Sequence, residues 1–300
     1  MAVVSEVPVE AGLEELAPAK PWHAVAIDLI RRYPLGAAGA VIVFVMIFLA
    51  LFADLIAPYD PEANSFEHMF TSPGLQFLLG TDDFGRDIFS RIIFGARTAL
   101  IVGFVAASVG ATAGLVLGVA SAYYGGWFDL ILQRVMDVFM AFPLIIMALA
   151  VVSVLGAGTE KVIIAITIPF IPQCARVVRS SALAIREIPY IDAARALGFS
   201  DARIILRHMV PNVMAPYLIM ITAFVGQAIL LEAVLSYLGL GIQEPTPAWG
   251  LMLKSGAEEY AESAPWVAIF PGIAISLAVF GFNLFGDALR DALDPKLRAQ

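Results

Sequence analysis

A series of long apolar segments, separated by shorter polar ones, constrains this chain more than any other feature. Six of them have about the length that a helix needs to cross roughly 30 Å of hydrocarbon. The peptide groups find no water there, so each segment must close its hydrogen bonds within a helix. The sequence therefore predicts an all-α membrane protein with six transmembrane helices, at about residues 37–56, 100–123, 130–155, 162–178, 213–235 and 266–285.

The composition agrees with this prediction. The chain is 60% hydrophobic and 15% charged, whereas soluble domains are about 45–50% apolar and about 25% charged. The net charge of −8 argues against nucleic acid as a partner. One cysteine, Cys174, and three scattered histidines offer neither a disulfide nor a metal cluster, so we expect no metal site and no catalytic residues.

The basic residues predict the orientation of the chain. With the N-terminus in the cytosol, 13 of the 18 Lys and Arg residues lie on the cytosolic side, as the positive-inside rule favours. Both termini are then cytosolic. We expect a cytosolic tail over 1–30, without the features of a signal peptide, and a membrane domain over 31–300. The segment 57–99 is expected outside the membrane, and the loop 179–212 in the cytosol.

The stretch YIDAARALGFSDARIILRHMVPN, residues 190–212, is amphipathic. Good helix formers precede Gly198, which suits a helix end with positive φ. Ser200 can cap a second short helix, and Pro211 is expected to close it. The pattern predicts a helix, a tight turn and a helix. It fits either amphipathic helices lying on lipid headgroups or a docking element, in which Ala193 and Ala194 let a partner approach closely.

The motif D-A-A-x-x-x-G at 192–198, followed by Val210-Pro211, resembles the EAA loop of binding-protein-dependent ABC importer permeases. The chain departs from that pattern at Asp192, His208 and Val210, where the family has Glu, Ile and Leu. The resemblance implies that this loop inserts into a groove on an ATPase subunit. The residues that it implies for this coupling contact are Asp192, Ala193, Ala194, Arg195, Gly198, Phe199, Arg203, Arg207 and Pro211.

Three further stretches resemble the dipeptide, oligopeptide and nickel permeases, of the second or C type. They are LGTDDFGRDIFSRIIFGARTAL (79–100), LSYLGLGIQEPTPAWG (235–250), where Glu244 replaces a usual proline, and NLFGDALRDALDPKLR (283–298). The resemblance covers about residues 25–298. It implies a type I ABC importer permease architecture in the bacterial cytoplasmic (inner) membrane.

The same resemblance implies the partners and cofactors. The partners are a B-type permease, one or two ATPase subunits, an extracytoplasmic substrate-binding protein and membrane lipids. The chain has no G-x-x-x-x-G-K-[ST] phosphate loop. We therefore expect it to bind no cofactor itself and not to be an enzyme, with ATP and magnesium held by the ATPase subunits.

The charged stretch before the second span predicts a helix outside the membrane, with Thr81 as its N-cap. Its charges are interpreted either as a solvated surface or as a contact to a partner permease or binding protein. Trp249, in the proline-containing loop, is expected to anchor at the membrane interface. The candidates for the extracytoplasmic contact are Asp82, Asp83, Arg86, Asp87 and Trp249.

Polar residues within spans are costly in lipid and usually face protein or water. Arg134 and Asp137 are interpreted as a local ion pair, and Glu232 as a residue of the translocation path or of the contact with the partner permease. The glycines in the second span are expected to allow close packing against neighbouring helices. The candidates for the path are Gln173, Gln227, Glu232 and Asn283.

Import of dipeptides or oligopeptides is the function that these observations favour, and nickel chelates, glutathione or opine-like compounds are alternative substrates. A gradient-driven secondary transporter would need an array of ionisable residues near the bilayer midplane, which the sequence lacks. A membrane enzyme would need a catalytic constellation such as H-E-x-x-H, and none occurs.

Overall fold

The chain forms a bundle of long helices. A computed structural model describes residues 30–258 and 260–293. Within them the main elements are α2 (Pro34–Leu51), α3 (Ala53–Ile56), the 3₁₀ turn η1 (Phe66–His68), α4 (Ile88–Tyr124), α5 (Gly126–Met140), α6 (Leu144–Leu155), α7 (Thr159–Arg186), α8 (Pro189–Ala196), α9 (Asp201–Ile204), the π turn η2 (Ile205–Met209), the 3₁₀ turn η3 (Val210–Val213), α10 (Met214–Tyr237), α11 (Trp249–Glu258) and α12 (Trp266–Leu293).

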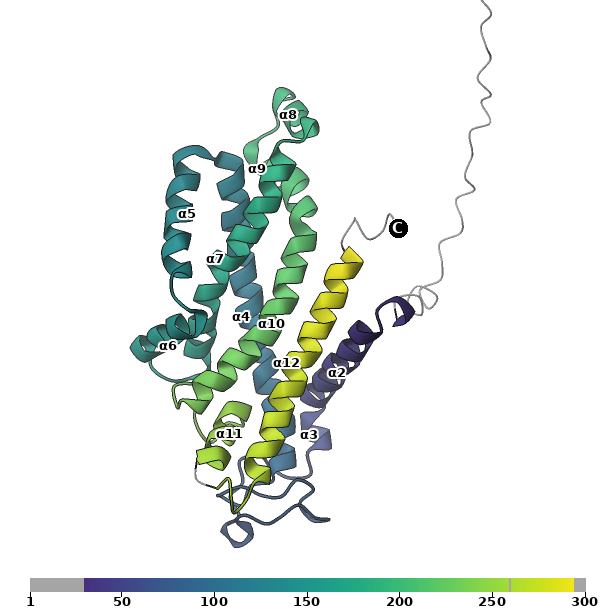
Figure 1. Cartoon of the computed structure of the whole chain (residues 1–300), viewed down its shortest axis with the longest axis vertical. Helices are drawn as coiled ribbons and strands as arrows, with labels where there is room; N and C mark the ends of the chain where they lie inside the picture. The colour runs from purple at the N-terminus through teal and green to yellow at the C-terminus, as the bar shows by residue number, and fades with distance from the viewer. Residues whose placement is uncertain (1–29, 259, 294–300) are drawn as a thin grey trace, which may run out of the picture.

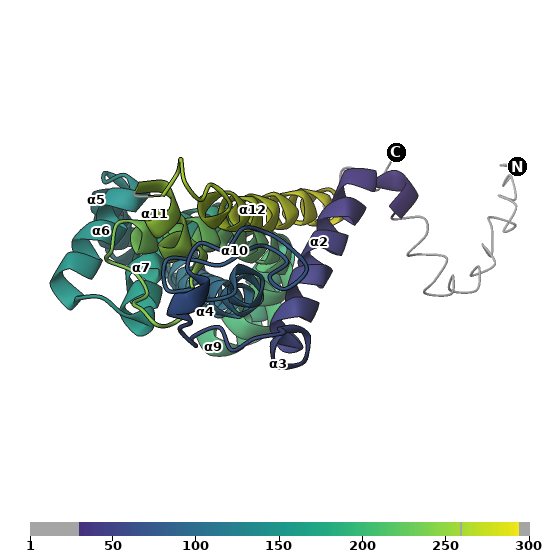
Figure 2. The ribbon, with the colours of Figure 1, turned by 90° about the horizontal axis from the view of Figure 1, so that it is seen from below.

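The long helices run between two different ends of the bundle. α8 projects at one end, and α11 lies at the other with the coil that precedes α4 (Figure 1). Seen from below, this coil and α11 cover the end of the bundle (Figure 2). Within the described residues, five helices are long and apolar enough to cross a membrane, and the bent pair α5 and α6 can make a sixth span. The predicted all-α membrane fold is confirmed.

The third predicted span is not one straight helix. The segment 130–155 is divided between α5 and α6, which meet at an angle of 88°. Pro143 occupies the N-cap position of α6. A proline disfavours the helical conformation of the residue before it, so α5 ends at Met140 and the chain turns before α6 begins.

Two other helices extend beyond the predicted spans. α4 has 37 residues and begins at Ile88, twelve residues before the expected start of the second span. α7 continues to Arg186, eight residues beyond the expected end of the fourth span. Polar side chains at these ends are tolerated because they lie near water or pair with each other, as Arg179 does with Asp129 at 2.6 Å.

Glycines in α4 allow it to pack closely along α7. A Cβ atom at Gly114 would lie 2.6 Å from Cys174 Cβ and 2.9 Å from the backbone nitrogen of Ala175. Gly110 and Gly118 also face α7, whereas Gly103 faces α10. The predicted packing role of these glycines is therefore confirmed.

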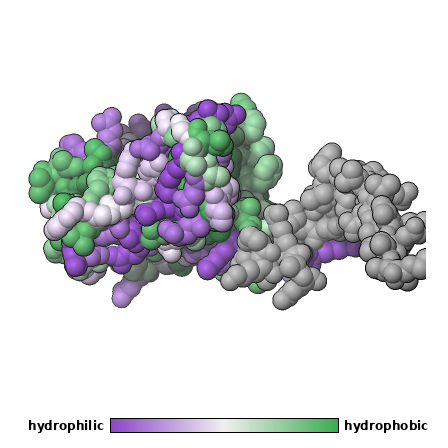
Figure 3. All heavy atoms as spheres, turned by 90° about the horizontal axis from the view of Figure 1, so that it is seen from above, coloured by the Kyte–Doolittle hydropathy of each residue, from purple (hydrophilic) through white to green (hydrophobic). Residues whose placement is uncertain are grey.

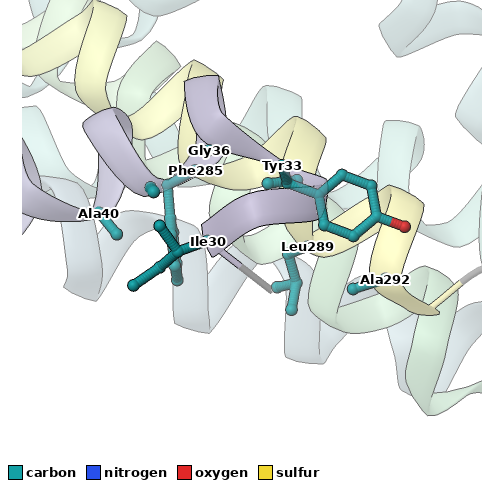
Figure 4. A pocket seen from close by; sticks show the side chains of 9 residues that line it. Ile30, Tyr33, Gly36, Ala40, Phe285, Leu289 and Ala292 are labelled. Atoms are coloured by element: carbon teal, nitrogen blue, oxygen red, sulfur yellow. The ribbon is translucent and has the colours of Figure 1, made fainter. Parts of the chain in front are cut away.

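α2 packs against α12 in the same manner, through Gly36 and Gly39. Where these helices diverge, they leave an open groove of about 300 Å³. Its lining is apolar and includes Ile30, Tyr33 and Leu289 (Figure 4). Among the described residues that line the groove, the one polar side-chain group is the hydroxyl of Tyr33.

Candidate functional sites

The projecting end of the bundle is formed by the segment 189–213, which we call the α8–α9 hairpin. Gly198 follows α8 with a φ of +76°. The amide of Phe199 donates to the Ala194 carbonyl at 3.1 Å, and the amide of Gly198 donates to the Arg195 carbonyl at 2.9 Å. These are the two bonds of a Schellman motif. The predicted helix, tight turn and helix are confirmed.

The hairpin is fixed to the bundle by one apolar face. Ile191, Ala194, Ile204 and Met209 are buried, whereas Ala193 is exposed. The expectation that both alanines of the D-A-A motif face outward is therefore wrong for the second one. Adjacent helix positions point about 100° apart, so Ala194 can face inward while Asp192 and Ala193 remain exposed.

The three arginines of the hairpin have different surroundings. Arg195 forms an ion pair with Asp192 at 3.1 Å and lies over the ring of Tyr123. Arg203 lies over the ring of Phe199, 4.1 Å from its centroid. Within the described part of the chain, Arg207 has no ion pair or ring contact, so its guanidinium is open to solvent or to a partner.

The hairpin is also joined to the end of α4. The hydroxyl of Tyr123 donates to a carboxylate oxygen of Asp201 at 2.6 Å. On the other side, the amide of Asn212 donates to the His208 carbonyl at 2.6 Å, and Tyr190 donates to the same carbonyl at 3.2 Å. These bonds tie the hairpin to α4 and hold its own two halves together.

Of the two predicted boundaries of the second helix, the first is confirmed at Ser200 and the second, at Pro211, is wrong. Ser200 occupies the N-cap position of α9 but makes no capping side-chain bond. Pro211 does not end the second helix, since residues 201–237 form one continuous helical stretch through η2 and η3. Pro211 lies in the first turn of η3, where a missing amide hydrogen costs little. The second half of the hairpin, from Asp201, and α10 thus form one continuous helical stretch.

The face seen from the α8 end carries many hydrophilic residues, with hydrophobic ones toward its edges (Figure 3). The exposed members of the implied coupling contact are Asp192, Ala193, Arg195, Gly198, Arg203, Arg207 and Pro211. Ala194 is buried and Phe199 is half-buried, so these two support the hairpin from inside.

The other end of the bundle holds a cluster of charged side chains. The cap of α4 is Asp87, whose carboxylate accepts from the amide and the hydroxyl of Ser90 at 2.8 and 2.7 Å. The prediction of Thr81 as the cap, with a separate charged helix, is wrong. Thr81 instead donates to the His68 carbonyl, because residues 81–87 form a folded turn before α4 begins.

Two arginines of this cluster are buried. Arg86 donates from Nε to Asp82 at 2.7 Å and from Nη1 to Glu244 at 2.5 Å. Arg91 is completely buried and lies 3.4 Å from Glu244 and 3.6 Å from Asp82. It also donates to the Pro61 carbonyl at 2.9 Å.

Burial changes the expected role of these residues. Asp82, Arg86, Asp87 and Trp249 are nearly inaccessible, so in this structure they offer no surface to another protein. Trp249 is not an interfacial anchor, since its indole nitrogen donates to the Ile92 carbonyl at 3.0 Å inside the bundle. The half-buried Asp83 has a pKa above its usual range because of burial and repulsion from Asp82.

Sequence reasoning did not connect Glu244 with these arginines. It lies more than 150 positions from both arginines, so no local pattern connects them. One signal in the sequence was available. Glu244 replaces the proline that is usual at this position of the family motif, and the same family carries the two arginines in its G-R-D and S-R motifs.

The four path candidates do not form one group. Glu232 is buried within the chain and accepts from the Ser236 hydroxyl at 2.7 Å, so it does not line an open path in this conformation. Gln227 and Asn283 are exposed, and Gln173 is half-buried. Asp137 pairs with Arg176 of α7 as well as with Arg134, at 3.7 Å from the latter.

Comparisons with known proteins agree with this architecture. Residues 110–299 match the family described as binding-protein-dependent transport system inner membrane component. Residues 20–73 match the N-terminal TM domain of oligopeptide transport permease C.

Relatives cover nearly the whole chain. A putative peptide transport system permease protein of Brucella suis biovar 1 is 45% identical over 87% of this chain and 88% of its own. A dipeptide transport system permease protein of Alkalihalophilus pseudofirmus is 42% identical over 93% of this chain and 91% of its own. A glutathione transport system permease protein of Escherichia coli O6:K15:H31 is 44% identical over 93% and 91%.

Solved structures share the fold. A chain of the MetNI methionine ABC transporter, in an inward facing conformation, superimposes with a TM-score of 0.56. The match is 18% identical and covers 69% of this chain and 98% of the other.

Proposed function

The chain belongs to the family of binding-protein-dependent transport system inner membrane components, and we propose that it carries peptides across the membrane as one half of a two-permease path. It is a multi-pass permease of the bacterial inner membrane and resembles peptide permeases over most of its length. ATP hydrolysis by separate subunits supplies the energy, and an external binding protein delivers the substrate.

The α8–α9 hairpin is the single feature that carries this proposal. It projects from the bundle, is fixed to it by an apolar face, and continues without interruption into α10. A continuous helical stretch of this kind can convert movement of an ATPase surface into movement of a membrane helix. The hairpin then lies in the cytosol, as the distribution of basic residues favours.

The outward side chains of the hairpin define the proposed ATPase contact. Ala193 and Gly198 allow close approach of the partner, and Arg207 supplies an unpaired positive charge. Arg195 and Arg203 lie on aromatic rings of this chain, so their main role is to hold the shape of the hairpin.

The proposed translocation path runs along the faces of α10 and α12 that expose Gln227 and Asn283. These amides can hydrogen-bond to peptide groups of a substrate. The second permease supplies the opposite wall. Glu232 is left out of this path because it is buried within the chain.

Glutathione is the second candidate substrate, because a relative of equal similarity is a glutathione transport system permease. The test is reconstitution in proteoliposomes with the second permease, the ATPase subunits and the binding protein. Dipeptides and longer peptides should stimulate ATP hydrolysis and accumulate inside. A complex whose ATPase phosphate-loop lysine is replaced is the control. Stimulation by glutathione alone would contradict the peptide proposal.

A further inference from the structure

The loop between α10 and α11, residues 238–248, is held at two points. Near α10, the amide of Ile242 donates to the Ser236 hydroxyl at 3.1 Å, and that hydroxyl donates to Glu232 at 2.7 Å. Farther along, Glu244 reaches the beginning of α4 through Arg86 and Arg91. The second contact is the ionic one, and it joins segments that are distant in sequence.

Glu244 completes the charge balance of this contact. Arg86 and Arg91 have side chains 5% and 0% exposed, and both lie near the single carboxylate of Asp82. Asp83 adds only a distant contact of 3.9 Å to Arg86. Without Glu244, two buried guanidinium groups would share Asp82, and burial of an unbalanced charge is costly.

The position of Glu244 connects this cluster to the hairpin. Residues 201–237 are one helical stretch, which begins in the α8–α9 hairpin and ends seven residues before Glu244. The ion pairs therefore anchor the loop that follows this helical stretch, and the other end of the stretch carries Arg207 of the proposed ATPase contact.

We propose that Glu244 is a positioning residue whose ion pairs with Arg86 and Arg91 hold the outer end of α10 on α4, and thereby transmit binding-protein docking to the ATPase contact. This inference rests on the proposed function. It assigns Glu244 to regulation of the ATPase rather than to substrate recognition.

The test compares Glu244→Gln with wild type in the reconstituted complex. Glutamine keeps the shape of the side chain but removes its charge. We expect the ratio of binding-protein-stimulated to basal ATP hydrolysis to fall about five- to tenfold, which is less than the loss of a fully buried charged hydrogen bond would give, because the Glu244 side chain is 42% exposed and partly screened by water. Glu244→Asp keeps the charge and should retain most of the stimulation. Glu262→Gln, an exposed residue before α12, is the matched control and should behave as wild type.

The possible results separate failure of the Glu244 inference from failure of the proposed function. Equal stimulation of wild type and Glu244→Gln would overturn the inference and leave the proposed function intact. Poor assembly of Glu244→Gln, with normal assembly of Glu262→Gln, would also overturn it, because Glu244 would then serve folding alone. A wild-type complex that neither responds to the binding protein nor moves peptide would instead refute the proposed function.

Discussion

Replacement of Gly198 tests whether the turn of the α8–α9 hairpin couples ATP hydrolysis to transport. The residue has a φ of +76°, and a Cβ atom there would meet no other atom within 4 Å. A substitution therefore costs backbone energy without a clash. For an ordinary L-residue this cost is about 1–2 kcal/mol, and a β-branched side chain increases it.

The structure gives the expected order of effects. One to two kcal/mol shifts a conformational equilibrium by a factor of about 5 to 30. Gly198→Ala should therefore lower the equilibrium ratio of the formed turn to other conformations by about that factor, and Gly198→Val should lower this ratio further. Asparagine tolerates positive φ, so Gly198→Asn should remain close to wild type. Membrane insertion should be unchanged in all three, because the site is exposed.

The measurement is the amount of peptide transported per ATP hydrolysed in the reconstituted complex. Gly198→Val should keep ATP hydrolysis and lose transport. Normal transport by this variant would refute the argument from the turn. Equal loss in Gly198→Asn and Gly198→Val would refute it differently, because the added bulk rather than the backbone would then be the cause.

Two further predictions concern the stability of the purified protein. Gly114→Ala should lower the thermal midpoint of unfolding, because overpacking costs about 1–3 kcal/mol. Gly272→Ala is the control and should leave the midpoint unchanged, because a Cβ atom there meets only a contact at 3.8 Å. Equal midpoints of the two variants would contradict the close packing of α4 on α7. Asp83→Asn should raise the midpoint at pH 7, because the raised pKa of Asp83 means that its ionised form disfavours folding. This gain should vanish below about pH 4, where the unfolded carboxyl is also protonated, and a gain independent of pH would contradict the assignment.

Local signals in the sequence were sufficient for the hairpin. Gly198 adopts the predicted positive φ because only the residue itself and its neighbours decide that conformation. The glycines of α4 pack against other helices as predicted. Pro211 misled the prediction because a proline is tolerated at the start of a helical turn, and the sequence does not show that a π turn precedes it.

Contacts between distant segments could not be predicted in the same way. The sequence predicts Trp249 at the membrane interface, and Asp82 and Arg86 on a solvated surface or at a partner contact, yet all three are buried in the chain. Their partners come from other parts of the sequence, and no spacing rule connects them. Glu244 was noticed only as a departure from a familiar motif.

The sequence by itself determined that the chain is a bundle of membrane helices with a two-helix hairpin. Lipid forces long apolar segments to satisfy their own backbone, and this rule acts within each segment. The tertiary structure alone decided which charges neutralise each other. Glu244 finds Arg86 and Arg91 only after α4, α10 and α11 have packed, because a buried ion pair depends on distances that packing sets.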